Sequence, residues 1–489
     1  VIGYGATGTT DNTVLLGNGS ITNWLPTDDN EVDLGSSSKE MKNVYVDGVT
    51  YTDAVGFGTV VMTLPTADGS DGQILKTDGS GTLSWVNNSG VAGAIDDLTD
   101  GKSGGTDFTG SMILGHQTTG TLDAATYNTA VGITALDAIT TGDYNVAVGY
   151  NALTANTTGN GNTAIGHEAL KVSTIGNYNS ASGMYSLRAN TEGSYNIASG
   201  VWSLGNNTTG SNNIAFGQNA LKANTTGTYN IASGYMSLDA NTTGTNNIAS
   251  GASSLTNNTT GSNNVASGKS SLSANTEGDY NIAIGYQSLM SNTTADRNIA
   301  IGKEALKLNT TGTRNIAIGA DAYNNADTEN DNLAIGYDAL GGSVAGGEYN
   351  VAIGNYALDA LTSADYNTAV GYNALTDIAA GGDNTAVGYD AGANVGTGSG
   401  NVFFGKEAGD ATTGGLNNVV IGNGADVSTG NAVNQIVIGK GATGQGDNYA
   451  VIGDADITRL YAAQDAGATL HAGGLNLGGT AVTSTATEL

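Results

Sequence analysis

One seventeen-residue pattern repeats along most of the chain and strongly limits what the chain can fold into. The glycine that ends the motif N-x-A-x-G, or a close variant of it, recurs every seventeen residues from Gly132 to Gly336. One interval of eighteen leads to Gly354, the interval of seventeen then continues to Gly439, and Gly115 extends the series backwards. Repeats of helix pairs need about 30 residues or more, so the period excludes a helical solenoid.

The consensus unit reads Y-N-[IVT]-A-[IVS]-G-x-x-[AS]-L-x-x-N-T-T-G-x. A short alternating run ends at the glycine, a second short run ends at the leucine, and an Asn-Thr-Thr-Gly turn closes the unit. This pattern predicts an all-β fold, a parallel β-solenoid (β-roll) whose coils each hold two short strands and two turns. Coils stacked at about 4.8 Å would make a rod of roughly 90 Å.

Each position of the unit should form a column along such a rod. The asparagine before each strand is expected to stack as a structural amide ladder. Its members are Asn145, Asn162, Asn179, Asn196, Asn213, Asn230 and Asn247. The alanine two positions before the glycine stays small from Ala130 to Ala386. This indicates either a face that another copy of the chain approaches closely, or a roll interior with no room for more.

Serines occur in correlated pairs. In five repeats, serine stands both directly before the anchor glycine and four positions later. The pairs are Ser182 with Ser186, Ser199 with Ser203, Ser233 with Ser237, Ser250 with Ser254, and Ser267 with Ser271. One hypothesis is that the two positions face each other and that their buried hydroxyls satisfy one another. Simple duplication of neighbouring repeats explains the pattern equally well.

The position directly after the anchor glycine varies freely, which indicates exposure to solvent. Exposed tyrosines in a row can stack on sugars or pack against a partner, and they can also merely shield the ladder. The candidate contact column consists of Tyr150, Tyr235, Tyr286, Tyr337, Tyr372 and Tyr389. Asparagines of the closing turn, such as Asn241 and Asn258, lie in glycosylation sequons. A recurring turn needs the same residues, and the turn is the favoured interpretation.

The chain carries no recognisable catalytic or metal-binding motif. Its three histidines, His116, His167 and His471, have no HExxH context, and it contains no cysteine. The glycine-rich stretches lack the lysine of a phosphate-binding loop. The acidic segment 327–332 could hold an ion, but a solvated turn is the favoured interpretation. We therefore expect no catalytic residue, no metal, no cofactor and no enzymatic function.

The net charge of −29, from 44 acidic and 15 basic residues, argues against two classes of partner. Nucleic acids and anionic lipid surfaces are bound by basic patches, which so acidic a chain is not expected to form. The apolar run 55–64 is too short to span a membrane, so no membrane insertion is expected. A long exposed surface that needs charge for solubility is the simplest explanation of the acidity.

The motif N-x-A-I-G and the glycine-containing turn after it resemble the head repeats of trimeric autotransporter adhesins of the YadA type. Similar arrays, of the form N-T-A-x-G-x-x-A-L-x-x-N-T-T-G, occur in bacteriophage tail fibres. The resemblance covers residues 111–456 and implies a left-handed parallel β-roll in a homotrimer, although the unit here is longer than that of the adhesin heads. Segments 30–48, 64–86 and 475–489 resemble modules and spacers of tail fibres and other fibrous surface proteins.

An internal comparison extends this picture, because Val1–Thr22 aligns without gaps on Val437–Thr458. The alignment predicts that the chain opens with the end of a preceding roll and is one period, or a segment, of a longer modular fibre. The predicted organisation is the end of a preceding β-roll (1–22), β-rich connector modules (23–110), the β-roll of 17-residue repeats (111–456) and a C-terminal connector or spacer (457–489).

Together these expectations favour a structural protein of an extracellular appendage, most simply the homotrimeric shaft of a virion tail fibre. The shaft would give reach and stiffness, and repeated weak contacts with a cell-surface glycan or protein receptor would add avidity. A bacterial trimeric surface adhesin is the alternative. A third reading is an ice-binding β-solenoid, because Thr157–Thr158, Thr225–Thr226 and Thr242–Thr243 could form a regular array.

Overall fold

The computed structural model describes part of the chain, which divides into two units, Val1–Val91 and Ala92–Leu489. The described residues are 54–57, 60–63, 65, 67, 70, 73–80, 82–87, 101–103, 110–115, 124–343, 345–457, 475–477 and 480–482. The predicted end of a preceding roll (1–22) lies outside them, as do His116 and His471.

Two antiparallel hairpins make up the described part of the first unit. Strand β1 (Ala54–Phe57) pairs with β2 (Val60–Thr63), and β3 (Gln73–Thr77) pairs with β4 (Leu83–Asn87). The turn between β3 and β4 is closed by Asp78, whose Oδ1 accepts hydrogen bonds from the backbone N–H groups of Ser80 and Thr82. Asp side chains suit this task because they accept bonds from residues just ahead of them.

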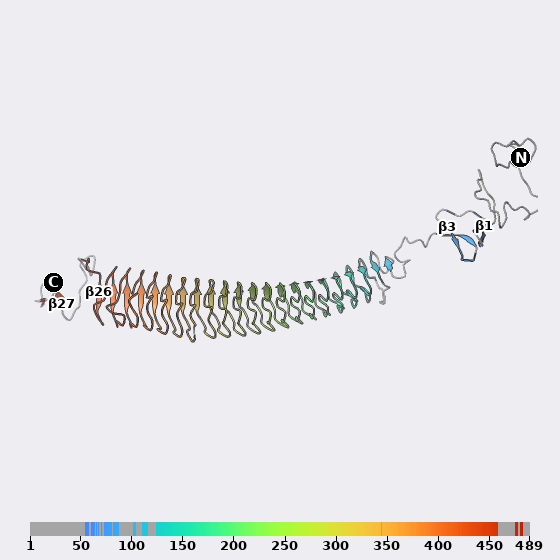
Figure 1. The fold of residues 1–489 in the computed structure, drawn as a ribbon. Helices are drawn as coiled ribbons and strands as arrows, with labels where there is room; N and C mark the ends of the chain where they lie inside the picture. Colours follow the sequence, from blue (N-terminus) through green and yellow to red (C-terminus); the bar gives the residue numbers. More distant parts are fainter. Residues whose placement is uncertain are drawn as a thin grey trace, which may run out of the picture. The chain divides into compact units, whose positions relative to one another are not determined.

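The second unit contains a parallel β-solenoid of about twenty coils (Figure 1). It opens with β5 (Gly101–Ser103), which pairs antiparallel with β6 (Met112–Leu114). From β6 onwards each strand pairs in parallel with the next, seventeen residues further on in most coils. The parallel strands that follow β6 are β7 (Thr129–Val131), β8 (Val146–Val148), β9 (Thr163–Ile165), β10 (Ser180–Ser182), β11 (Ile197–Ser199), β12 (Ile214–Phe216), β13 (Ile231–Ser233), β14 (Ile248–Ser250), β15 (Val265–Ser267), β16 (Ile282–Ile284), β17 (Ile299–Ile301), β18 (Ile316–Ile318), β19 (Leu333–Ile335), β20 (Val351–Ile353), β21 (Thr368–Val370), β22 (Thr385–Val387), β23 (Val402–Phe404), β24 (Val419–Ile421), β25 (Ile436–Ile438) and β26 (Ala450–Ile452). A short antiparallel pair, β27 (Leu475–Leu477) and β28 (Thr480–Val482), follows near the C-terminus.

Each repeat of the solenoid contains one three-residue strand, so the prediction of two strands per coil is wrong. In the repeat around Gly234, Met236 and Leu238 adopt left-handed backbone angles, with φ of 54° and 51°. Extended structure needs negative φ, so this half of the coil is a chain of turns. The turns are still held to the neighbouring coil, because Leu238 N–H donates to the Ser254 carbonyl. The predicted seventeen-residue coil itself is confirmed.

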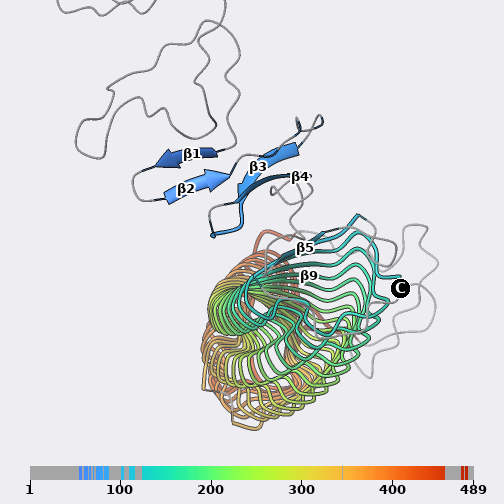
Figure 2. The ribbon, with the colours of Figure 1, turned by 90° about the vertical axis from the view of Figure 1, so that its right-hand side faces the viewer.

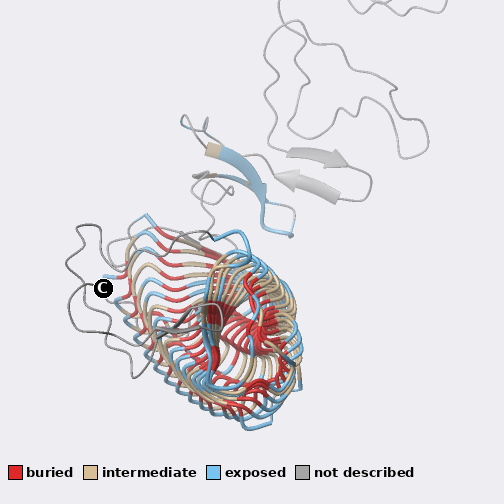
Figure 3. Ribbon diagram, turned by 90° about the vertical axis from the view of Figure 1, so that its left-hand side faces the viewer, coloured by how far each residue is buried: buried red, intermediate tan, exposed pale blue. Residues whose placement is uncertain are grey.

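The interior of the solenoid is narrow and is filled mainly by the alanine of the strand, by the leucine and by the small alanine or serine that precedes the leucine. Ala232, the middle residue of β13, and Leu238 are both fully buried, and the same two columns are buried along most of the solenoid. The buried residues line the inside of the stack in Figure 3, and Figure 2 shows the coils stacked one behind another. The small alanine therefore reflects lack of interior space, and the alternative of close approach by another chain at this column is wrong.

One pair of coils fills the interior differently. Phe403 replaces the alanine in β23 and is fully buried. The leucine position is Gly392 in the coil before it and Gly409 in its own coil. A Cβ added at Gly409 would lie 2.0 Å from Phe403 Cδ1, and one at Gly392 would lie 2.7 Å from Phe403 Cδ2. The ring thus occupies the volume that leucine side chains fill elsewhere, which keeps the interior packed.

Candidate functional site

An amide ladder runs along the inside of the solenoid, through the asparagine before each of the strands β7 to β24. Asn230 donates from its backbone N and its Nδ2 to Asn213 Oδ1, at 3.0 and 3.2 Å. Its own Oδ1 accepts the equivalent two bonds from Asn247, and its Nδ2 also donates to the Gly244 carbonyl at 2.8 Å. These buried side chains are thus satisfied by bonds within and between coils. All seven asparagines of the predicted ladder occupy this buried column.

A second buried ladder, which the sequence interpretation missed, is formed by the asparagine of the closing turn. Asn241 Nδ2 donates to Asn224 Oδ1 at 2.8 Å, and Asn258 Nδ2 donates to Asn241 Oδ1 at the same distance. Asn241 Nδ2 also reaches the Gly244 carbonyl, which therefore joins the two ladders within one coil. Both asparagines are fully buried, so the turn interpretation of these sequons holds in the folded chain. The regular Asn-x-x-Gly spacing was the available signal.

The predicted pairing of serine hydroxyls is wrong. Ser182 faces outward and is exposed, whereas Ser186 is fully buried. Instead of meeting Ser182, the Ser186 hydroxyl donates to the Gly183 carbonyl at 2.8 Å. The backbone turns at Gly183, with φ of 135°, and it leaves Ser182 on the outside of the coil wall and Ser186 on the inside. Short-range pairing across a glycine corner is therefore not available to these side chains.

The six tyrosines of the candidate contact column are all exposed, with 43–52% of each residue accessible. Two runs of touching rings involve them. In the first, Tyr150 stacks on His167, which contacts Tyr185, which in turn contacts Trp202. In the second, Tyr337, Tyr356, Tyr372 and Tyr389 follow one another at centroid distances of 5.4 to 5.8 Å. Tyr235 and Tyr286 belong to neither run. Contacts between these rings thus link successive coils and still leave part of each ring exposed to solvent.

A further set of tyrosines lies in the turns that precede eight of the strands, and the sequence interpretation assigned it no role. Its members are Tyr127, Tyr144, Tyr178, Tyr195, Tyr229, Tyr280, Tyr349 and Tyr366, each with positive φ and an exposed side chain. Where two of these tyrosines lie in successive coils, their rings stack almost face to face. The ring centroids of Tyr349 and Tyr366, for example, are 5.2 Å apart, and the angle between the ring planes is 3°. The recurring Tyr-Asn dipeptide was the signal that could have revealed it.

The outward side of the strand ladder is a long uncharged surface. We call it the outer strand face, defined as the first and third residues of strands β7 to β26. None of these residues is charged, and most are Ile, Val or Leu, with Thr and Ser among them. Ile231, Ile248 and Phe216 are exposed by 38%, 41% and 47%. Strands of parallel sheets that are apolar on both faces are normally covered on both faces.

Ion pairs link neighbouring coils away from this face. Glu168 Oε1 lies 2.8 Å from Lys171 Nζ in its own coil, and Glu168 Oε2 lies 2.7 Å from Arg188 Nε in the next coil. Hydrogen bonds from these two cations lower the pKa of Glu168 to about 2. Near the C-terminal end, burial and the neighbouring Asp410 raise the pKa of Asp426 to about 6. Asp426 therefore gains a proton as pH falls below that value, which gives this end of the solenoid a titratable group near neutral pH.

The acidic segment 327–332 is structural at its centre, so the expected solvated turn is wrong for Glu329. This side chain is almost fully buried. Its oxygens accept hydrogen bonds from the backbone N–H groups of Asp327, Thr328 and Gly346. Nearby, the Asn332 Nδ2 donates to the hydroxyl of Tyr323, a buried ring at the leucine position. These bonds hold together the coils around the single eighteen-residue interval.

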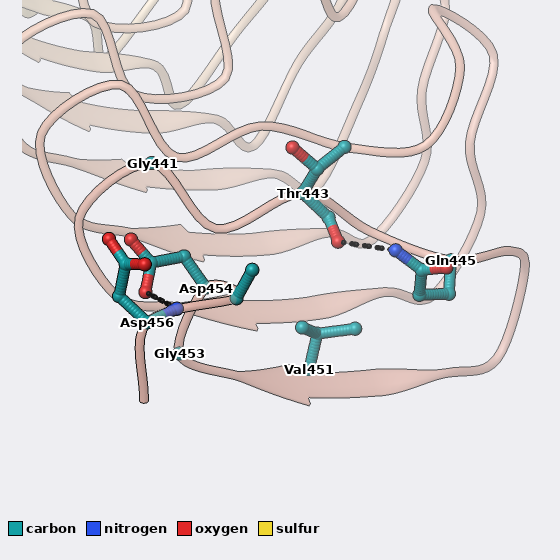
Figure 4. A pocket seen from close by; sticks show the side chains of 8 residues that line it. Gly441, Thr443, Gln445, Val451, Gly453, Asp454 and Asp456 are labelled. Carbon is teal, nitrogen blue, oxygen red and sulfur yellow. Dashed lines mark hydrogen bonds between the residues drawn. The ribbon is translucent and has the colours of Figure 1, made fainter. Parts of the chain in front are cut away.

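One shallow hollow lies at the C-terminal end of the solenoid (Figure 4). It is lined by Gly441, Thr443, Gln445, Val451, Gly453, Asp454, Ala455 and Asp456. Asp454 Oδ1 accepts a hydrogen bond from Asp456 N–H, and Gln445 Nε2 donates to the Thr443 carbonyl. Among the residues that the structure describes, no three His, Cys, Asp or Glu side chains are grouped so as to hold a metal ion. The hollow therefore offers the polar groups of Thr443, Gln445, Asp454 and Asp456.

Comparison with models of known protein families and with curated proteins found no match. The resemblance to adhesin heads and tail fibres consequently remains a hypothesis. In the described part of the chain no helix is long and apolar enough to cross a membrane.

Proposed function

We propose that this protein is the shaft of an extracellular fibre, in which copies of the solenoid associate through their outer strand faces. The observation that carries the proposal is the absence of charge from this face in a chain of net charge −29. Twenty coils at about 4.8 Å give a stripe about 95 Å long, and two outward residues make it about 10 Å wide. Its area, on the order of 900 Å² per copy, is typical of stable interfaces.

A closed ring of identical copies is the assembly that suits such a stripe. When the symmetry axis runs parallel to the solenoid, every copy turns the same stripe towards the axis and none is left exposed. The resemblance to adhesin heads and tail fibres suggests three copies. The acidic side chains would then lie on the outside of a homotrimer, where their mutual repulsion opposes further association.

The mechanical role follows from how the coils are held together. Each coil contacts only its neighbours, through the strand ladder and the amide ladder before the strands. In some coils the second amide ladder and stacked tyrosine rings add further contacts. Such an array extends by repetition and resists bending at every step, which is what a shaft needs. The exposed tyrosines offer repeated weak contacts for a cell-surface glycan or protein receptor, and repetition would convert these into avidity.

A virion tail fibre is the preferred setting, and a bacterial surface adhesin is the alternative. The ice-binding reading loses its main support, because the first threonine of each pair is engaged. Thr242 Oγ1 donates to the Thr259 carbonyl at 3.0 Å, and Thr225 bonds to Thr242 in the same way. A hydroxyl that donates to a carbonyl of the next coil is not free to donate to ordered water at the surface.

Immunogold electron microscopy of a culture that produces the protein tests this setting. Antibodies raised against residues 124–457 should label thin fibres projecting from virions. Label on the surface of intact cells would support the adhesin alternative instead. Label confined to the inside of sectioned cells, with none on any appendage, would contradict the proposal. A culture in which the coding sequence is deleted provides the control for antibody specificity.

A further inference from the structure

Side-chain size changes along the outer strand face without any period. The third residue is Val or Ile in β7 to β9, and it becomes apolar again from β16 onwards. Between these stretches it is serine in β10, β11, β13, β14 and β15. The exception is Phe216 in β12, which stands between Ser199 and Ser233 in the ladder and is exposed by 47%. A single aromatic ring thus projects from a run of small polar residues.

Such a profile discriminates between ways of packing two copies together. When copies associate in parallel and in register, the Phe216 rings meet at one level, and the serines above and below leave room for them. A slip of one coil would place each ring against serine, and would set Ile165 of one copy against Ser182 of another. Contacts between aromatic rings would be lost, and apolar side chains would face hydroxyls.

The profile of side-chain sizes also discriminates between parallel and antiparallel association of two copies. Only three strands of the parallel ladder, β7 to β9, lie between β6 and the serine run, whereas eleven, β16 to β26, follow it. An antiparallel pairing that matched the serine runs would leave most of the later apolar stretch without a counterpart. The parallel arrangement covers the whole face.

We propose that Phe216, together with the serines that flank it, fixes the axial register and the parallel direction in which copies of this chain associate. The inference rests on the self-association proposed above, and the partner is a second and third copy of the same chain. Specificity of this kind comes from mismatches in the wrong arrangements as much as from contacts in the right one.

Cysteine cross-linking can read the register directly, because the chain contains no cysteine. Three versions of the full chain, with Ser199→Cys, Ser233→Cys or Ser250→Cys, would be co-expressed in pairs, one of each pair lengthened by a tag. Positions 199 and 233 are two coils apart, roughly 10 Å, and positions 199 and 250 are three coils apart, roughly 14 Å, so neither pair is within reach of a disulfide when the copies are in register. A slip of one coil would bring positions 199 and 233 within reach, and an antiparallel pairing of the serine runs would do so for positions 199 and 250. In the otherwise unchanged protein, disulfides should join like positions at least about tenfold more often than unlike positions.

The informative variant is Phe216→Ser in the same cysteine backgrounds. Its side chain is half exposed in the single chain, so the variant should fold, and circular dichroism would check this. Disulfides between unlike positions should rise until they are within about threefold of those between like positions. Phe404→Ser is the matched control, because Phe404 lies in the same column between Val387 and Ile421, where no run of serines sets it apart. This control should keep the original ratio.

Failure of the register inference is distinguishable from failure of the proposed assembly. If Phe216→Ser still cross-links only like positions, the copies associate but Phe216 does not set their register, and the inference is wrong. If Ser199→Cys joins mainly to a distant position in the unchanged protein, the direction is wrong. If no cross-link forms and the protein sediments as a single chain, both the assembly and the inference fall.

Discussion

Single asparagine side chains carry much of the cohesion between coils. Asn230 makes bonds to the coil before it, the coil after it and its own closing turn, all without access to water. Its position in a ladder could be predicted because identical spacing puts identical residues in one column. The second ladder could not be separated from a surface turn, because Asn-Thr-Thr-Gly is equally suited to both.

Replacing Asn230 by Asp should therefore destabilise the solenoid by about 2–4 kcal/mol, since a carboxylate would face the Asn213 amide oxygen and the Gly244 carbonyl without a donor. Urea unfolding followed by circular dichroism measures the loss. The control is Thr243→Asp, which adds the same charge at an exposed position of the next turn. Equal effects of the two substitutions would show that charge, and not the ladder, is responsible.

The anchor glycine is required for a different reason, namely backbone approach between coils. Gly234 has φ of 144°, and a Cβ there would lie 2.5 Å from the Gly251 carbonyl oxygen. Gly234→Ala should cost at least about 2 kcal/mol, because the clash is with backbone and φ is strained as well. Gly424→Ala, where φ is 60° and nothing lies within 4 Å, should cost about 1 kcal/mol. Similar losses of stability in the two variants would refute this account.

At the scale of the coil, the period and the strand could be predicted, but the second half of the repeat could not. The run that ends in leucine has the alternation of a strand, yet Leu238 adopts a left-handed conformation that β-branched and bulky residues normally avoid. Burial of the leucine and a hydrogen bond to the next coil outweigh that local preference. The turn at Gly183 also explains why the predicted serine pairing is wrong, since Ser182 before it is exposed and Ser186 after it is buried.

The packing of the Phe403 ring into the space of the leucine column can be tested by substitution. Phe403→Ala should destabilise the protein by about 3–5 kcal/mol through the cavity it leaves. Gly409→Leu alone should also destabilise it, because the new side chain would overlap the Phe403 ring. The double variant restores the alanine and leucine of other coils and should be more stable than either single variant. Additive losses in this double-mutant cycle would contradict the packing described here.

The C-terminal coils should respond to pH through Asp426. Because burial raises its pKa to about 6, the folded state holds a proton that the unfolded chain releases at lower pH. Its stabilising contribution is therefore complete below the ordinary carboxyl pKa and is lost as pH rises through about 6. Hydrogen exchange in coils beyond Gly405 should accordingly be faster at about pH 7.5 than at about pH 5, after correction for intrinsic rates. In Asp426→Asn this difference should shrink, and an unchanged difference would exclude Asp426 as its source.

For the whole molecule, the decisive feature is the separation of charge from the outer strand face. Composition alone indicates an acidic surface. Composition does not show which face is free of charge, because this depends on which strand residues point outward. Ala232 points inward, and its neighbours Ile231 and Ser233 therefore point out. The alternation of residues along a strand does not say which set of side chains faces the interior. The buried leucine and asparagine columns show which side is the interior.

A charge placed on this face should prevent association without harming the single coil stack. Ile248→Asp lies at the middle of the outer strand face, where it is 41% exposed in the single chain. We expect it to lower the mass of the assembly in solution while the circular dichroism spectrum stays unchanged. Thr243→Asp, on another side of the same region, should leave the mass of the assembly as it is. Loss of the assembly in both variants would point to general repulsion.

Sedimentation equilibrium of the purified full chain tests directly whether the solenoid associates with copies of itself. We expect a mass of three times 48.7 kDa, independent of protein concentration over the accessible range. A mass of 48.7 kDa at every concentration would contradict the proposed association.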